Sequence, residues 1–209
     1  MKNAAVTFRT AFLALGTIIL MVGQAAAHDG KKHAPTPSPT LAAKPPALPF
    51  DVGGPFKLID HHGKERTDQD FRGQFMLVFF GYANCQSICP VGLRRMTAAL
   101  DALGPTGAKV QPLLISVDAA NDTPDSMRPE VLKVHPRLLG LTGTDAQLKS
   151  AAKTYQVESK VVSRTPDGKP IFAHGSFIYL MDPDGKLATI IPPVLVDEQM
   201  AGIIRRYVN

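Results

Sequence analysis

Beyond residue 50, apolar residues gather in three continuous runs. Residues 75–81 (FMLVFFG) and 110–118 (VQPLLISVD) read as strands buried on both faces of a sheet, and residues 177–181 (FIYLM) form a third such run. Apolar positions recur at helical spacing over about 88–103, 124–134, 145–155 and 196–207. The pattern therefore predicts strands that alternate with helices in the first part of the folded region.

Turn residues divide the remaining sequence into shorter strands. A strand at 56–59 ends at the turn DHHG, and residues 138–141 form another short strand. The turns TPDG at 165–168 and DPDG at 182–185 separate 157–162 from 170–173 and 177–181 from 187–191. This order predicts a thioredoxin-like α/β fold, with a central mixed sheet flanked by helices and an added antiparallel hairpin.

The first 49 residues have a different composition. Lys2 and Arg9 precede an apolar run at 11–22 and three alanines at 25–27, which is typical of a secretory signal peptide. We expect residues 1–27 to be this signal, cleaved after Ala27, with an uncleaved membrane anchor as the alternative. Residues 28–49 read as a Pro/Ala-rich linker and 50–209 as one folded domain. We therefore expect a periplasmic protein, either soluble or anchored at its N-terminus.

Charge narrows the classes of partner. The chain has 23 Lys and Arg against 18 Asp and Glu, a formal net charge of +5. These cations are spread along the sequence without a basic cluster, so we expect no nucleic-acid partner.

The only two cysteines, Cys85 and Cys89, follow the apolar run 75–81 directly and precede a predicted helix. Amides at a helix N-terminus favour thiolate over thiol. Three uses remain open: a structural disulfide, thiol–disulfide exchange, and metal binding. A disulfide across so short a loop removes little chain entropy. Exchange proteins usually have two residues between the cysteines, whereas the three found here also suit a shared metal ion.

A metal site would need a third ligand. Two thiolates alone can hold Cu(I), and an added histidine would admit Cu(II). Among the six histidines, His174 is the one beside predicted central strands, at the start of the run HGSFIYL. A lone histidine in such a place is also typical of a structural residue. Zinc is the weaker candidate, because a structural zinc site needs four protein ligands.

Several short blocks occur in a fixed order along the chain. They are DFRG at 70–73, FGY at 80–82, CQSICP at 85–90, SVD at 116–118, DTP at 122–124, GLTG at 140–143, His174, and YLMDPDG at 179–185. In these blocks the chain resembles the Sco copper-chaperone family, also called SenC or PrrC, over about residues 56–207.

The resemblance implies a function and a ligand set. One copper ion, Cu(I) or Cu(II), would be bound by Cys85, Cys89 and His174 and delivered to the CuA centre of cytochrome c oxidase. A copper donor and a thiol reductant are possible further partners. The alternative is a thiol–disulfide reductase that keeps partner cysteines reduced, with Cys85 and Cys89 as its redox pair.

The loop between the cysteines departs from the family pattern. Gln86 and Ser87 stand where proline and aspartate are common in the family. The absence of a carboxylate should favour thiolate, and the absence of a proline should loosen the loop, so we expect both residues to tune copper affinity.

Overall fold

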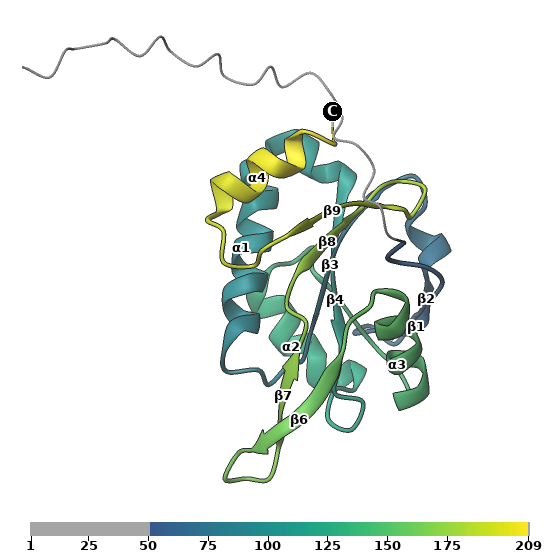
Figure 1. Ribbon diagram of the computed structural model, residues 1–209, viewed down its shortest axis with the longest axis vertical. Coiled ribbons are helices and arrows are strands. Elements are labelled where there is room, and N and C mark those ends of the chain that lie inside the picture. Colours follow the sequence, from purple (N-terminus) through teal and green to yellow (C-terminus); the bar gives the residue numbers. More distant parts are fainter. Residues whose placement is uncertain (1–50, 209) are drawn as a thin grey trace, which may run out of the picture. The chain divides into compact units, whose positions relative to one another are not determined.

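The computed structural model describes residues 51–208 and shows a seven-stranded mixed sheet with a separate two-stranded ribbon (Figure 1). The predicted signal peptide at 1–27 and linker at 28–49 lie outside the described residues. The sheet order is β2-β1-β5-β4-β3-β8-β9, and the ribbon is β6-β7. The strands are β1 Lys57–Asp60, β2 Glu65–Thr67, β3 Phe75–Gly81, β4 Val110–Ser116, β5 Leu139–Thr142, β6 Ser159–Arg164, β7 Pro170–His174, β8 Ile178–Met181 and β9 Leu187–Ile191.

Four α-helices accompany the strands: α1 Ile88–Ala102, α2 Pro124–Val134, α3 Asp145–Thr154 and α4 Asp197–Arg205. The predicted fold class is confirmed, because β3, β4 and β5 run parallel while β1, β8 and β9 pair antiparallel with their neighbours. Over residues 51–208, no helix combines the length and the hydropathy needed to span a bilayer.

Strand β3 lies inside the sheet between β4 and β8, and this position explains its apolar sequence. Successive side chains of a strand point to opposite faces. Leu77 and Phe79 pack into a core with α1, α2 and α4, whereas Val78 and Phe80 pack into a second core with α3. Figure 1 shows α1 and α4 together on one side and α3 on the other. Both faces of the sheet are therefore covered.

Two helices begin where the sequence predicts. Thr123 accepts the N–H of Ser126 at the start of α2, and Pro124 occupies the first helical turn. Thr144 accepts the N–H of Gln147 in the same way at the start of α3. These caps satisfy backbone donors that a helix leaves free at its N-terminus.

The strand predicted at 157–162 begins later, because β6 spans Ser159–Arg164. Gln156 has a positive φ of 54°, and Val157 is buried in the core beside the end of α3. The chain must complete this turn before it can extend. Two 3₁₀ helices, Asp68–Phe71 and Gly104–Lys109, were not predicted, because each is a short connection without an apolar period.

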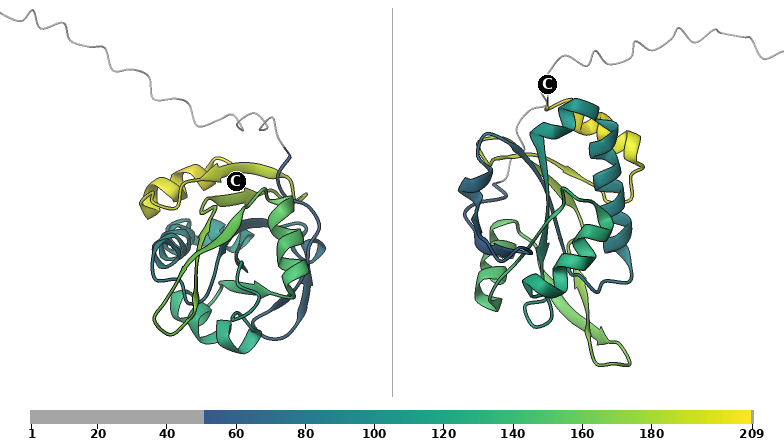
Figure 2. Two further views of the ribbon diagram at one scale, coloured as in Figure 1. Left: turned by 60° about the horizontal axis from the view of Figure 1, so that its bottom comes forward. Right: turned by 180° about the vertical axis from the view of Figure 1, so that it is seen from behind.

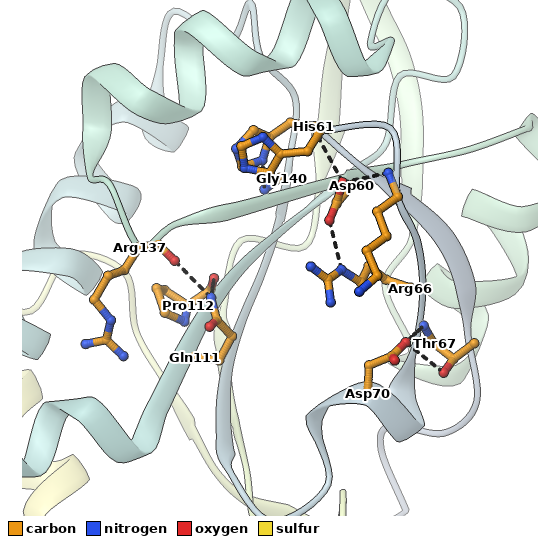
Figure 3. Close-up of polar contacts among 11 residues, drawn as sticks. Asp60, His61, Arg66, Thr67, Asp70, Gln111, Pro112, Arg137 and Gly140 are labelled. Atoms are coloured by element: carbon orange, nitrogen blue, oxygen red, sulfur yellow. Dashed lines mark hydrogen bonds and ion pairs between the residues drawn. The ribbon is translucent and has the colours of Figure 1, made fainter.

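A buried carboxylate closes the β1–β2 hairpin (Figure 3). Asp60 is fully buried and accepts the backbone N–H groups of His62 and Lys64, each at 2.9 Å, and Arg66 Nε at 2.8 Å. Burial opposes ionisation, but the hydrogen bond from Arg66 and those from the two amides hold the Asp60 pKa below its usual range.

Candidate metal centre

Both cysteines lie just beyond the carboxyl end of β3, where α/β sheets commonly place functional groups. Cys85 is in the loop that leaves the strand, and its N–H donates to the Tyr82 carbonyl at 3.2 Å. Cys89 is the second residue of α1. Both side chains are free thiols, 6% and 1% exposed respectively. The order of strand, loop and helix therefore holds two sulfurs at the rim of the core.

His174 reaches the cysteines from the ribbon. Its Nε2 lies 3.7 Å from Cys89 Sγ, and its ring packs near Phe79 and Tyr82, with ring centroids 6.4 and 6.1 Å away. The histidine is the last residue of β7, and residues 175–177 connect it to β8. The sequence placed it instead at the mouth of a central strand. The ribbon is a separate antiparallel hairpin, as the predicted fold included, but the local pattern does not show that His174 belongs to it.

The tautomer of His174 suits a metal ligand. Its Nδ1 lies 3.0 Å from the Gly175 carbonyl, which can only accept a hydrogen bond, so Nδ1 carries the proton. In the neutral ring Nε2 then keeps its lone pair and faces Cys89. Metal–nitrogen and metal–sulfur bonds of about 2.0–2.3 Å allow two ligands of one ion to be roughly 4 Å apart. The 3.7 Å separation fits this limit.

The two thiols differ in acidity. A hydrogen bond from Cys89 is the main cause that lowers the Cys85 pKa. Hydrogen bonds from His174 and from the backbone N–H groups of Ser87 and Cys89 lower it further. Together they outweigh the effect of burial and bring the Cys85 pKa to about 3. The same hydrogen bond, together with burial, raises the Cys89 pKa. Burial opposes protonation of His174, but its contact with Cys85 raises the His174 pKa. Cys85 is therefore the thiolate of the pair.

The three side chains are near one another but do not form a complete coordination site. No group of three or more His, Cys, Asp and Glu side chains in residues 51–208 is already arranged to hold a metal ion. Two soft sulfurs and one imidazole are a donor set suited to copper, and the same dithiol could exchange with a disulfide.

Two residues that support the site were missed in the sequence. Asp122 accepts the N–H of Ala83 at 3.1 Å and the Ser116 hydroxyl at 2.6 Å, which ties the cysteine loop to the end of β4. A Cβ at Gly81 would lie 3.1 Å from Cys89 Sγ. The sequence DTP was read as a helix start, and nothing local shows that its aspartate also bonds a loop 39 residues away.

The other histidines of residues 51–208 lie away from the thiols. His61 is 1% exposed, and its Nδ1 accepts the N–H of Gly140 at 3.1 Å, so Nε2 carries the proton. Burial lowers the His61 pKa, which keeps the ring neutral, and a protonated Nε2 cannot bind a metal. The His62 ring packs against the His61 ring at a tilt of 42°, and His135 contacts Asp101.

Fold and site together define a thioredoxin-like α/β domain with a pair of cysteines beyond the carboxyl end of β3 and a histidine facing them. The chain belongs to the SCO1/SenC family, whose pattern it matches over residues 44–209.

Individual relatives agree with this assignment. "Protein sco1" of Schizosaccharomyces pombe is 36% identical over 159 residues, which are 75% of this chain and 60% of that protein. The chain thus spans less than two thirds of this relative. The structure of Bradyrhizobium japonicum ScoI with copper bound is similar with a TM-score of 0.69 and 37% identity, over 75% of this chain and 99% of that one. The structure of yeast Sco1 with copper bound is similar with a TM-score of 0.70 and 34% identity, over 76% of this chain and 89% of that one.

Proposed function

We propose that this protein is an exported metallochaperone that binds one copper ion through Cys85, Cys89 and His174 and delivers it for assembly of the CuA centre of cytochrome c oxidase. The observation that carries the proposal is the placement of His174 Nε2, which has a lone pair when the ring is neutral, 3.7 Å from Cys89 Sγ. The copper-bound ScoI and Sco1 structures, 37% and 34% identical to this chain, support the choice of metal.

The arrangement suggests an order of events. Cys85, already a thiolate, meets the incoming ion first. Cys89 then binds as it loses its proton, because metal binding to a thiol releases a proton. His174 completes the site from the ribbon. Release to the receiving protein would follow the reverse order, one ligand exchanged at a time. A Cys85–Cys89 disulfide offers no thiolate, so oxidation would prevent copper binding.

Anaerobic copper titration of the reduced protein tests the assignment. We expect one Cu(I) per domain, and we expect the His174→Ala variant to lose Cu(II) affinity by about tenfold or more, since a whole ligand is removed. His62→Ala is the matched control, because His62 is an exposed histidine in the hairpin after β1. Equal Cu(II) affinity in the His174→Ala variant and the wild type would refute the ligand set.

A second candidate function is reduction of a partner's disulfide. The lowered Cys85 pKa favours it, since the attacking group is a thiolate. Cys85 would attack one partner sulfur, and Cys89 would resolve the mixed disulfide. Two electrons and the Cys89 proton would pass to the partner, leaving a Cys85–Cys89 disulfide, one partner thiol and one partner thiolate, which would take its proton from water. Copper-free reduced protein should then reduce an oxidised CuA domain, and His174→Ala should preserve that activity while copper binding falls.

A further inference from the structure

The two edges of the β6–β7 ribbon are not equivalent. On the β7 edge, Phe172 donates its N–H to the Tyr82 hydroxyl at 3.5 Å, the Phe172 and Tyr82 rings pack with centroids 5.3 Å apart, and Pro170 has no N–H to offer. On the β6 edge no further strand is present among residues 51–208. One edge of the ribbon is therefore closed and the other is open.

The open strand is unusually exposed. All six residues of β6 are exposed, including Val161 at 48% and Val162 at 55%. Figures 1 and 2 show the ribbon extending beyond the rest of the domain. An exposed strand edge with apolar side chains readily pairs with another extended chain, and a two-stranded ribbon alone is marginally stable. A third strand would stabilise it.

A hollow of about 520 Å³ lies beside the first half of β6. Its far wall is the face of α3 that carries Leu148 and Ala152, and Val161 and Phe172 line the ribbon side. A chain paired with β6 could therefore bury alternate apolar side chains in this hollow, as strand addition requires.

Charge indicates the chemistry of the occupant. Strand β6 carries two cations, Lys160 and Arg164, and no carboxylate, whereas Asp118 and Asp145 line the hollow away from the strand. Among residues 51–208 neither cation forms an ion pair, whereas Lys149 across the hollow is already paired with Asp145 at 2.8 Å. A second copy of this chain would add the same two cations. An acidic segment would complement them.

We propose that an extended acidic segment of the copper-receiving protein adds to the open edge of β6 as a third strand. This inference rests on the proposed function. Ser159 of β6 is the register partner of His174, so the added strand would lie beside the ribbon end that carries a copper ligand. Docking would then bring the receiving protein to the site without using Cys85 or Cys89.

The probe is the copper-free soluble CuA domain of cytochrome c oxidase subunit II, mixed with the full-length chain. We expect amide hydrogen exchange to slow across residues 159–164, and Lys160→Glu to weaken the complex by about tenfold through charge reversal. Lys109→Glu is the matched control and should bind as the wild type does, because Lys109 is exposed and precedes β4, at the end of the sheet opposite the cysteines. A milder variant, Lys160→Gln, should lie between these values.

Three outcomes would overturn the docking proposal: no complex, protection confined to surfaces other than β6, or unchanged affinity in the Lys160→Glu variant. Protection of β6 that appears at high protein concentration without the probe would assign the edge to a second copy instead. Each of these leaves the copper titration of the chain alone unaffected. Loss of copper binding by the wild-type protein, in contrast, would defeat the proposed function itself.

Discussion

The carboxylate of Asp122 accepts the backbone N–H of Ala83, two residues before Cys85, at 3.1 Å. The same carboxylate accepts the Ser116 hydroxyl, and its side chain belongs to a residue that is only 2% exposed. A buried acid at the start of α2 thus holds the loop that positions the first thiol. Burial, partly offset by the Ser116 and Ala83 hydrogen bonds, raises the Asp122 pKa to about 6.

The first prediction concerns stability against pH in the Asp122→Asn variant. The folded pKa of about 6 exceeds the unfolded value, so the contribution of Asp122 to stability is present below about pH 4 and lost as pH rises through 6. Asparagine does not titrate, and it can still accept from Ala83. The free energy of unfolding of Asp122→Asn, relative to that of the wild type, should therefore rise by roughly 2–3 kcal/mol from pH 4 to pH 7. Urea denaturation at both pH values measures this, and parallel pH profiles would contradict it.

The second prediction concerns the source of the Cys85 acidity. In reduced, copper-free protein, Cys89→Ala removes the thiol that donates to Cys85, so the Cys85 pKa should rise from about 3 toward its usual range. Cys89→Ser keeps a donor at the same position and should retain most of the lowering. Ultraviolet absorbance of the thiolate against pH reports the titration. Identical curves for Cys89→Ala and Cys89→Ser would show that the Cys89 hydrogen bond is not the cause.

The third prediction tests the unusual loop sequence. Ser87 Oγ lies 3.7 Å from Cys85 Sγ, so Ser87→Asp would place a carboxylate beside the thiolate. A like charge disfavours ionisation, and we expect the Cys85 pKa to rise and copper affinity to change by about tenfold. Ser87→Asn has a similar size without the charge and serves as the control. The idea fails if the aspartate and asparagine variants show the same pKa and the same affinity.

The fourth prediction concerns the space behind Cys89. A Cβ at Gly81 would lie 3.1 Å from Cys89 Sγ, 3.2 Å from Phe79 Cε1 and 3.3 Å from Leu114 Cδ1. Gly81→Ala should therefore displace the sulfur, weaken copper binding and cost about 1–3 kcal/mol of stability. Gly202→Ala is the control, because its Cβ meets nothing within 4 Å and alanine favours helix α4. Wild-type copper affinity in Gly81→Ala would contradict the prediction.

The sequence predicted the buried parts of this protein better than its exposed parts. Strand β3 was placed at 75–81 as observed, because burial on both faces requires an unbroken apolar run. Strand β6 was placed two residues too early, because all of its residues are exposed and no period constrains them. The cysteines could be located from their position after β3.

The role of a histidine depends on contacts that the sequence does not contain. The sequence favours His174 over His61 only by its place beside predicted central strands, and it shows neither ring's tautomer. The carbonyl of Gly175 and the N–H of Gly140 fix opposite tautomers in the two neutral rings, and in that form only His174 has a lone pair at Nε2. The structure brings Cys85, Cys89 and His174 together as the resemblance implied, while their binding of copper stays a prediction.

The three proposed ligands belong to two parts of the molecule that differ in burial and strand pairing. Cys85 and Cys89 are buried where β3, packed on both faces, meets α1, whereas His174 ends a strand paired only with an exposed neighbour. A copper ion bound by all three residues would link the ribbon to the core. The free-energy cost of fixing the ribbon would then be part of the copper-binding constant, so substitutions in β6, which contributes no ligand, would change copper affinity.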